Sequence, residues 1–211
     1  DRDVLDLSPS DGDAGIGPLL NNRQLTVQAR NIHLAPSTQK LTADTDVRST
    51  IKPQKAAAAP APGGRSSVPP QGQTHVPGIL KQDQQVNVTS NRLDYGGVAE
   101  ATYNGSALLW QDKSRIAGET IVMNDSTGNL TAKGNVRSTM MLEDEDPKTK
   151  VRTLTETRGS ADILVYDDAK RLATYTATGA TPARLTSVQG DTRGNRIDLF
   201  LKESGNEVER A

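Results

Sequence analysis

A duplicated stretch of twenty residues constrains the fold of this chain more than any other feature of its sequence. Residues 32–51 and 121–140 align at a constant offset of 89 residues, and ten of the twenty aligned positions carry the same residue. Self-similarity of this extent marks a repeated structural unit. Both copies alternate apolar and polar residues around a polar turn, which is typical of half-buried β-strands.

Weaker copies of the same pattern begin at Leu93, Ile163 and Ile197. Each has an apolar pair spaced by one residue, a turn of polar residues and glycine, and, where the chain continues, an alternating strand. Only 34% of the residues are hydrophobic and 3% aromatic, which suits short strands joined by tight turns. No stretch has a convincing helical period. The sequence therefore predicts an all-β protein built from repeated short strands.

Composition also divides the chain. Residues 52–80 are rich in Pro, Ala, Gly and Ser and predict a flexible linker. It separates an N-terminal β segment, residues 1–51, from a larger β domain, residues 81–211. A charged stretch at residues 142–150 predicts a loop or hairpin excursion within the larger domain.

Charge and cysteine content exclude several classes of function. The 25 basic residues are scattered among 26 acidic ones, with a net charge of −1, so we expect no nucleic-acid partner. Cysteine is absent, which excludes disulfides and thiolate catalysis. A membrane-spanning helix requires a run of about 18 apolar residues, and the sequence has no such run. Nothing indicates a cofactor.

Candidate catalytic and metal-binding residues are few. His33 and His75 are isolated histidines, and the acidic run at residues 143–146 lacks the ligand spacing of a calcium loop. Asp191 and Asp198 leave open a carbohydrate-active β-helix enzyme, since glycoside hydrolysis uses paired carboxylates. We expect no metal site and no catalytic site.

The alternating apolar face has two interpretations. It is either the packed interior of a structural β-solenoid that binds protein partners, or an apolar groove that admits a lipid. The scarcity of large side chains requires a thin structure or unfilled internal space, and a lipid channel needs unfilled space.

The larger domain resembles a known family. The words "NRLDY", "ATYNGSALLWQ", "SRIAGETIVMND" and "LTAKGNV" occur in this order within residues 86–136. In that order and spacing they resemble the OstA-like family, which includes LptA, LptC and the N-terminal domain of LptD. The resemblance covers residues 81–211 and one repeat within residues 23–51. The whole chain thus resembles an LptC-like portion, the first segment, joined to an LptA-like portion, the larger domain.

The resemblance implies an antiparallel β-jellyroll, or β-taco, whose two facing sheets enclose an apolar groove. It implies a non-enzymatic lipopolysaccharide-transport module in the periplasm of a diderm bacterium. The acyl chains of lipopolysaccharide would lie in the groove. Other components of the bridge, or further copies of the chain, would pair with its terminal edge strands.

The predicted groove lining follows from the two-residue period of a strand, and a bulge would invert it. The residues expected to contact lipid are Val86, Val88, Leu93, Tyr95, Ala101, Tyr103, Ala107, Leu109, Ile116, Ile121, Met123, Leu130, Ala132, Val136, Ile163, Val165, Ile197 and Leu199.

Overall fold

The computed structural model describes residues 4–9, 17–22, 24–53, 75–96, 100–145, 152–188, 190–202 and 208–210. Over these ranges the chain forms one antiparallel sheet of 15 strands and a single 3-10 turn, Pro36–Thr38. The prediction of an all-β protein is confirmed. No helix in the described ranges is long and apolar enough to cross a membrane.

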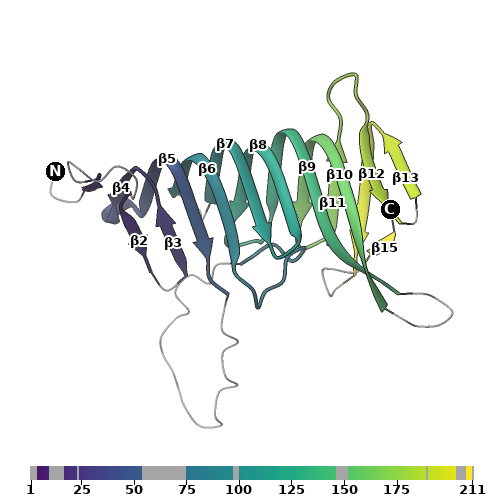
Figure 1. Ribbon diagram of the computed structural model, residues 1–211, viewed down its shortest axis with the longest axis horizontal. Helices are drawn as coiled ribbons and strands as arrows, with labels where there is room; N and C mark the ends of the chain where they lie inside the picture. Colours follow the sequence, from purple (N-terminus) through teal and green to yellow (C-terminus); the bar gives the residue numbers. More distant parts are fainter. Residues whose placement is uncertain are drawn as a thin grey trace, which may run out of the picture.

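Strand order follows chain order through the middle of the sheet (Figure 1). The strands are β1 (Leu5–Leu7), β2 (Leu19–Asn21), β3 (Leu25–Gln28), β4 (Asn31–Ala35), β5 (Lys40–Ile51), β6 (Val86–Gly96), β7 (Glu100–Gln111), β8 (Ser114–Asn124), β9 (Leu130–Glu145), β10 (Arg152–Asp167), β11 (Leu172–Thr176), β12 (Ala183–Ser187), β13 (Gly190–Gly194), β14 (Arg196–Leu201) and β15 (Val208–Arg210). The central strands are longer than the sequence indicated, since β9 and β10 have 16 residues each.

The sheet folds over itself into two layers because each long strand has different neighbours along its two halves. The first half of β5 pairs with β4 and its second half pairs with β3. At the other end of the sheet, β10 pairs with β12 through residues 158–160 and with β11 through residues 163–167. We call the halves on the side of β4 and β11 layer 1, and those on the side of β3 and β12 layer 2. This doubled antiparallel sheet agrees with the expected β-jellyroll.

The fold line between the layers is built from paired left-handed residues in every second strand. Such a pair opposes a single residue of the neighbouring strand, as Thr45 and Asp46 oppose Asn91. The pairs and their φ angles are Thr45 (68°) and Asp46 (54°) in β5, Gly105 (80°) and Ser106 (50°) in β7, and Gly134 (78°) and Asn135 (50°) in β9. These bulges bend the strands sharply. The long strands arch over together on the upper side of Figure 1.

The bulges also decide which residues face inward. Because the bulge in β5, β7 and β9 contains two residues, it leaves the alternation of inward and outward side chains unchanged along each strand, and in β9 both Ala132 and Val136 are buried. The single opposing residue in β6, β8 and β10 shifts the phase by one. In β10 the buried positions change from Thr157 and Gly159 before the bulge to Leu164 and Tyr166 after it.

The core lies between the layers and runs along the whole sheet. Its buried residues form one cluster from Val27 on β3 to Leu199 on β14. The segments before and after the proposed linker share this core, because β5 pairs with β6 from Leu41 to Ile51. The division into an N-terminal segment, a linker and a larger domain stays a prediction, although one sheet spans both β parts.

We call the side opposite the fold line the mouth. The turns at residues 125–129 and 168–171 of layer 1 and the end of β7 in layer 2 border it. A segment without strand pairing, residues 75–82, crosses between them, and we call it the strap. Its first residues belong to the predicted flexible linker, but they are packed against the core. The rest of the linker, residues 54–74, lies outside the described residues.

Candidate functional site

The structure brings the predicted groove-lining residues together in the space between the layers. All of them are buried except Tyr95, Ile163 and Val165. Tyr95 is partly buried at the mouth. Whether any of these residues contacts a lipid stays a prediction.

The prediction for Ile163 and Val165 is wrong in its direction. Val165 is 41% exposed, whereas Leu164 and Tyr166 are 0% and 1% exposed. Asp162 of β10 alone opposes the bulge pair Gly134 and Asn135 of β9, which shifts the inward phase of β10 by one residue, so the strand presents its other face to the core.

Other interior residues were missed. Leu41, Ala43 and Val47 of β5 are buried and occupy the repeat positions of Leu130, Ala132 and Val136 of β9. The 89-residue duplication held the signal for them, but the groove prediction was confined to the larger domain. Further missed residues are Met140, Leu142, Ala173, Tyr175 and Leu201.

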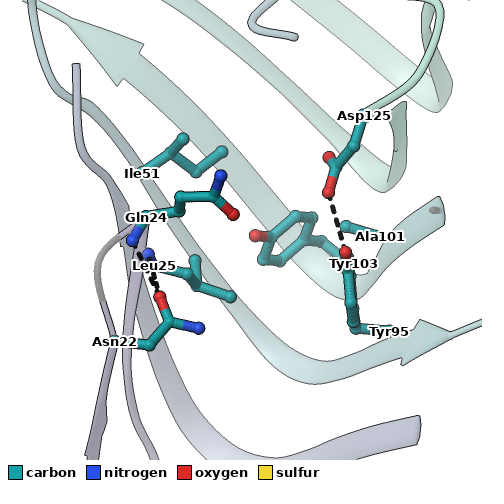
Figure 2. Close-up of a pocket in the computed structure, with 8 residues that line it drawn as sticks. All are labelled: Asn22, Gln24, Leu25, Ile51, Tyr95, Ala101, Tyr103 and Asp125. Atoms are coloured by element: carbon teal, nitrogen blue, oxygen red, sulfur yellow. Dashed lines mark hydrogen bonds between the residues drawn. The ribbon is translucent and has the colours of Figure 1, made fainter. Parts of the chain in front are cut away.

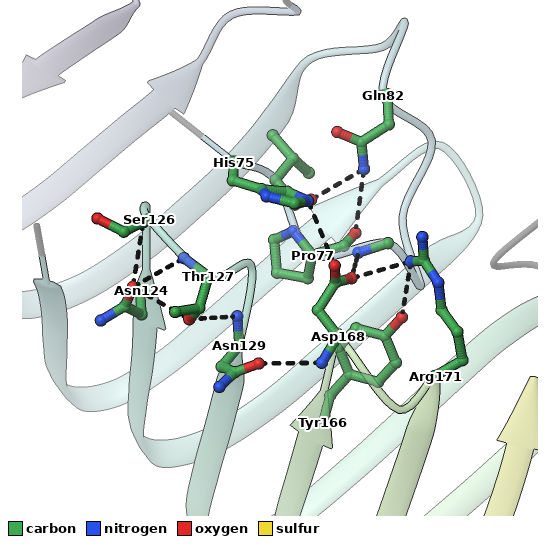
Figure 3. Close-up of polar contacts among 12 residues, drawn as sticks. His75, Pro77, Gln82, Asn124, Ser126, Thr127, Asn129, Tyr166, Asp168 and Arg171 are labelled. Atoms are coloured by element: carbon green, nitrogen blue, oxygen red, sulfur yellow. Dashed lines mark hydrogen bonds and ion pairs between the residues drawn. The ribbon is translucent and has the colours of Figure 1, made fainter. Parts of the chain in front are cut away.

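The strap begins on layer 1 and ends on layer 2. The backbone N–H of His75 donates to the carbonyl oxygen of Asp125 at 2.7 Å. The N–H of Gly78 donates to Asp168 Oδ1 at 2.7 Å, and His75 Nε2 lies 3.3 Å from Asp168 Oδ2 (Figure 3). At its other end, the N–H of Lys81 donates to Gln111 Oε1 at 2.6 Å.

The apolar residues of the strap enter the core. Val76, Ile79 and Leu80 are 2%, 5% and 5% exposed and belong to the same cluster as the groove lining. Burial of a side chain of this size contributes roughly 1.5–3 kcal/mol. The strap also holds its own shape, since Gln82 Nε2 donates to the carbonyl oxygen of Val76 at 2.8 Å.

Asp168 is the polar centre beneath the strap, as Figure 3 shows. Its Oδ1 accepts from Arg171 at 3.0 Å as well as from Gly78, and its backbone N–H donates to Asn129 Oδ1 at 2.9 Å. Gly78 lets the strap approach these two side chains closely. A Cβ there would lie 1.7 Å from the Arg171 guanidinium and 2.6 Å from Asp168 Oδ1.

A small cavity of about 60 Å³ opens at the mouth beside the strap. Figure 2 shows Tyr95, Tyr103 and Asp125 on one side and Gln24, Leu25 and Ile51 on the other. The apolar wall comes from β3, β5 and β7, and polar groups form the rim. Asp125 borders both the cavity and the strap, so the two features are adjacent.

Burial changes the titration of the groups on this rim. The hydroxyl of Tyr95 donates a hydrogen bond to Asp125 Oδ2, with 3.0 Å between the two oxygens. Loss of solvation raises the pKa of the Asp125 carboxyl, and the bond from Tyr95 opposes this effect. Burial, together with the charge of Asp125, raises the pKa of Tyr95 to about 12. The rim therefore holds a partly buried carboxylate with one neutral donor.

Each member of the candidate carboxylate pair, Asp191 and Asp198, is bound by arginine. Asp191 accepts hydrogen bonds from Arg184 and Arg193, and the Arg184 guanidinium lowers the pKa of the Asp191 carboxyl. Asp198 is held by Arg196 and Thr174. A general acid requires a raised pKa, so this pair does not favour glycoside hydrolysis.

The histidines do not point to a metal centre. His33 Nδ1 contacts Asp6 Oδ1, and His75 contacts Asp168. The described part of the chain has no group of three His, Cys, Asp or Glu residues able to hold a metal ion. The side chains of the acidic run, residues 143–146, lie outside the described residues.

Comparison with known proteins gives a likeness in structure but none in sequence. No protein-family model matches the chain, and no curated protein matches it. Among solved structures, it is similar to LptH, the LptA-homologous periplasmic component of the lipopolysaccharide transport device from Pseudomonas aeruginosa. The TM-score is 0.43 at 12% identity, over 66% of this chain and 92% of that one. The strand pairing of this chain shows its fold independently of that likeness.

Proposed function

We propose that this protein is a periplasmic module of lipopolysaccharide transport, which shields acyl chains between its two layers. The observation that carries the proposal is the continuous apolar interior, to which strands from β3 to β14 contribute. The resemblance of residues 86–136 to the OstA-like family supports the same function. No reaction is required, because lipid moves along an apolar lining.

Small inward side chains make room for an acyl chain. Ala101, Ala107 and Ala132 are all 5% exposed or less and lie at the predicted lining positions. Burying an acyl chain contributes roughly 0.8 kcal/mol per CH₂ group. Transfer of an acyl chain from water into this interior is therefore favourable in proportion to the length of the chain.

Edge strands supply the contacts for assembly. Among the described residues, β1 and β2 at one end of the molecule and β13 and β15 at the other pair on one side only (Figure 1). A free strand edge offers backbone donors and acceptors to another chain. In the proposed bridge, these edges join the module to other components or to further copies of itself.

A lipid-free structural scaffold is the second candidate, and the packing of the interior favours it. The cavity of about 60 Å³ is small compared with the roughly 300–1,000 Å³ of ordinary ligand pockets. Under the transport proposal, the layers or the strap must move to admit lipid. Under the scaffold proposal, the interior stays closed.

Lipid extraction separates the two proposals. The protein is purified from lipopolysaccharide-producing cells, and extracted lipid is identified by mass spectrometry. We expect lipid A species to co-purify with the unmodified protein and to fall at least about fivefold with Ala132→Trp, because Ala132 is 0% exposed. Lys133→Trp, at the next, exposed position, is the matched control and should leave the lipid yield unchanged.

Circular dichroism is used to establish that both variants keep the β fold. Absence of lipid A from the unmodified protein, or equal lipid yields from Ala132→Trp and Lys133→Trp, contradicts transport and supports the scaffold.

A further inference from the structure

The strap is placed where an acyl chain would enter the interior. It lies over the mouth, between the turns of layer 1 and the end of β7, and joins no strand ladder in the described part of the chain. Its apolar side chains Val76, Ile79 and Leu80 are in the same cluster as the groove lining. The strap therefore fills apolar volume that the two layers alone would leave open at the mouth.

The polar ties of the strap lie at the rim. They join His75 to Asp125 and Asp168, Gly78 to Asp168, and Lys81 to Gln111 through two hydrogen bonds. Departure of the strap would expose these acceptors to water, which can replace each donor. Asp168 would keep its ion pair with Arg171 at 3.0 Å, so no buried charge would be left without a partner.

Part of the strap's shape is internal to it. The N–H of Leu80 donates to the carbonyl oxygen of Pro77, and the Gln82 amide donates to the carbonyl oxygen of Val76. These bonds do not depend on either layer. The strap can therefore leave as a unit, in contrast to a strand whose backbone would lose a whole ladder.

We propose that the strap is a built-in occupant of an acyl-chain site, and that an acyl chain of a bound lipid displaces it. The proposal rests on the proposed function and adds to it how the closed interior is opened. Strap and acyl chain compete for the same apolar volume, so each weakens the binding of the other. The small cavity beside Asp125 is the uncovered end of this site, from which displacement begins.

The first experiment weakens the strap. Ile79→Ser combined with Leu80→Ser removes two of its buried apolar side chains. As a control, Lys81→Ser combined with Asp83→Ser changes two exposed residues, one in the strap and one just after it. Affinity for purified hexa-acylated lipopolysaccharide is measured by displacement of a fluorescent lipopolysaccharide. We expect Kd to fall about tenfold or more for the first variant and to stay unchanged for the second. An equal or higher Kd in a folded Ile79→Ser, Leu80→Ser variant overturns the proposal.

The second experiment uses the unmodified protein and does not depend on how a variant folds. Hydrogen exchange is followed with and without lipopolysaccharide. We expect the amides of Gly78 and Lys81 to exchange at least about tenfold faster with lipid bound, while amides of β7 and β9 keep their protection. If lipopolysaccharide binds and the strap amides stay protected, the strap proposal fails while the transport proposal stands. If neither the unmodified protein nor the variant binds it, both proposals fail.

Discussion

The residue at the first position of each left-handed pair shows how the repeat tolerates strain. Gly105 and Gly134 occupy this position in β7 and β9, but Thr45 occupies it in β5 with φ 68°. A left-handed conformation costs a residue with a side chain roughly 1–2 kcal/mol, and a β-branched residue is especially unsuited to it. Thr45 is exposed, so packing of its side chain returns little stability.

We therefore expect Thr45→Gly to raise the free energy of unfolding by about 1 kcal/mol, since the relief of strain exceeds the entropy lost by glycine. The reverse change, Gly134→Thr at the equivalent repeat position, should lower it, because a Cβ there would lie 2.7 Å from Glu119 Cγ. Urea denaturation measures both. Equal stability of Thr45→Gly and the unmodified protein would show that the corner of β5 is not strained.

Asp125 gives a pH dependence with a definite sign. Burial raises the pKa of this carboxyl in the folded protein above its value in the unfolded chain. The folded state then binds the proton more tightly, so Asp125 costs stability at neutral pH, and this cost disappears as pH falls through its folded pKa. We expect Asp125→Asn to be more stable than the unmodified protein at pH 7.5, with the difference shrinking toward pH 4.

Asp167 is the matched control because its titration is displaced in the other direction. A hydrogen bond from Lys170 lowers the pKa of the Asp167 carboxyl. Its contribution to stability is therefore present above its ordinary pKa of about 4 and is lost as pH falls below that value. Asp167→Asn should lose stability at pH 7.5 and little at low pH. Parallel pH profiles for the two variants would contradict the assigned environments.

At the scale of the strand, the sequence predicted most of the interior. Period-2 alternation located the buried faces of β7 and β9 because their paired bulge residues conserve the inward phase. It also succeeded in β6, where Val88 precedes the bulge and Leu93 follows it, because only one face of this strand is apolar on each side of the bulge. In β10 the residues that follow the bulge are apolar on both faces of the strand, so alternation alone could not decide whether Leu164 or Ile163 faces inward.

The strap could not be predicted from alternation. Val76, Pro77, Ile79 and Leu80 follow a stretch rich in Pro, Ala and Gly, and they have no period that marks a strand. Their burial depends on acceptors at Asp125, Asp168 and Gln111, which the fold brings together from three turns or strand ends distant in sequence. Local composition indicates that this segment forms no β-strand. It does not indicate that the segment packs against the strands of the sheet.

The register of β10 is testable by paired truncations. Leu164 is 0% exposed and Val165 is 41% exposed. We expect Leu164→Ala to cost roughly 2–5 kcal/mol of unfolding free energy through the cavity it leaves, and Val165→Ala less than about 1 kcal/mol. Urea denaturation of both variants provides the measurement. The opposite order would restore the inward phase expected from the sequence.

At the scale of the whole molecule, one folded sheet joins the segments on either side of residues 54–74. Leu41, Ala43 and Val47 continue the interior formed by their repeat counterparts in β9. The apolar interior therefore extends from β3 to β14. Under the transport proposal, an acyl chain in this interior would contact both parts of the chain along one path.

Site-specific photo-crosslinking tests the central claim most directly. A photoreactive amino acid is placed at Ala132 or Val136, which face the interior, and at Arg137 or Thr139, which the alternation of β9 directs outward. Each protein is irradiated with lipopolysaccharide, and the adduct is detected by immunoblot. The account predicts strong adducts from Ala132 and Val136 and weak ones from the outward pair. Adducts from Arg137 or Thr139 alone would contradict it.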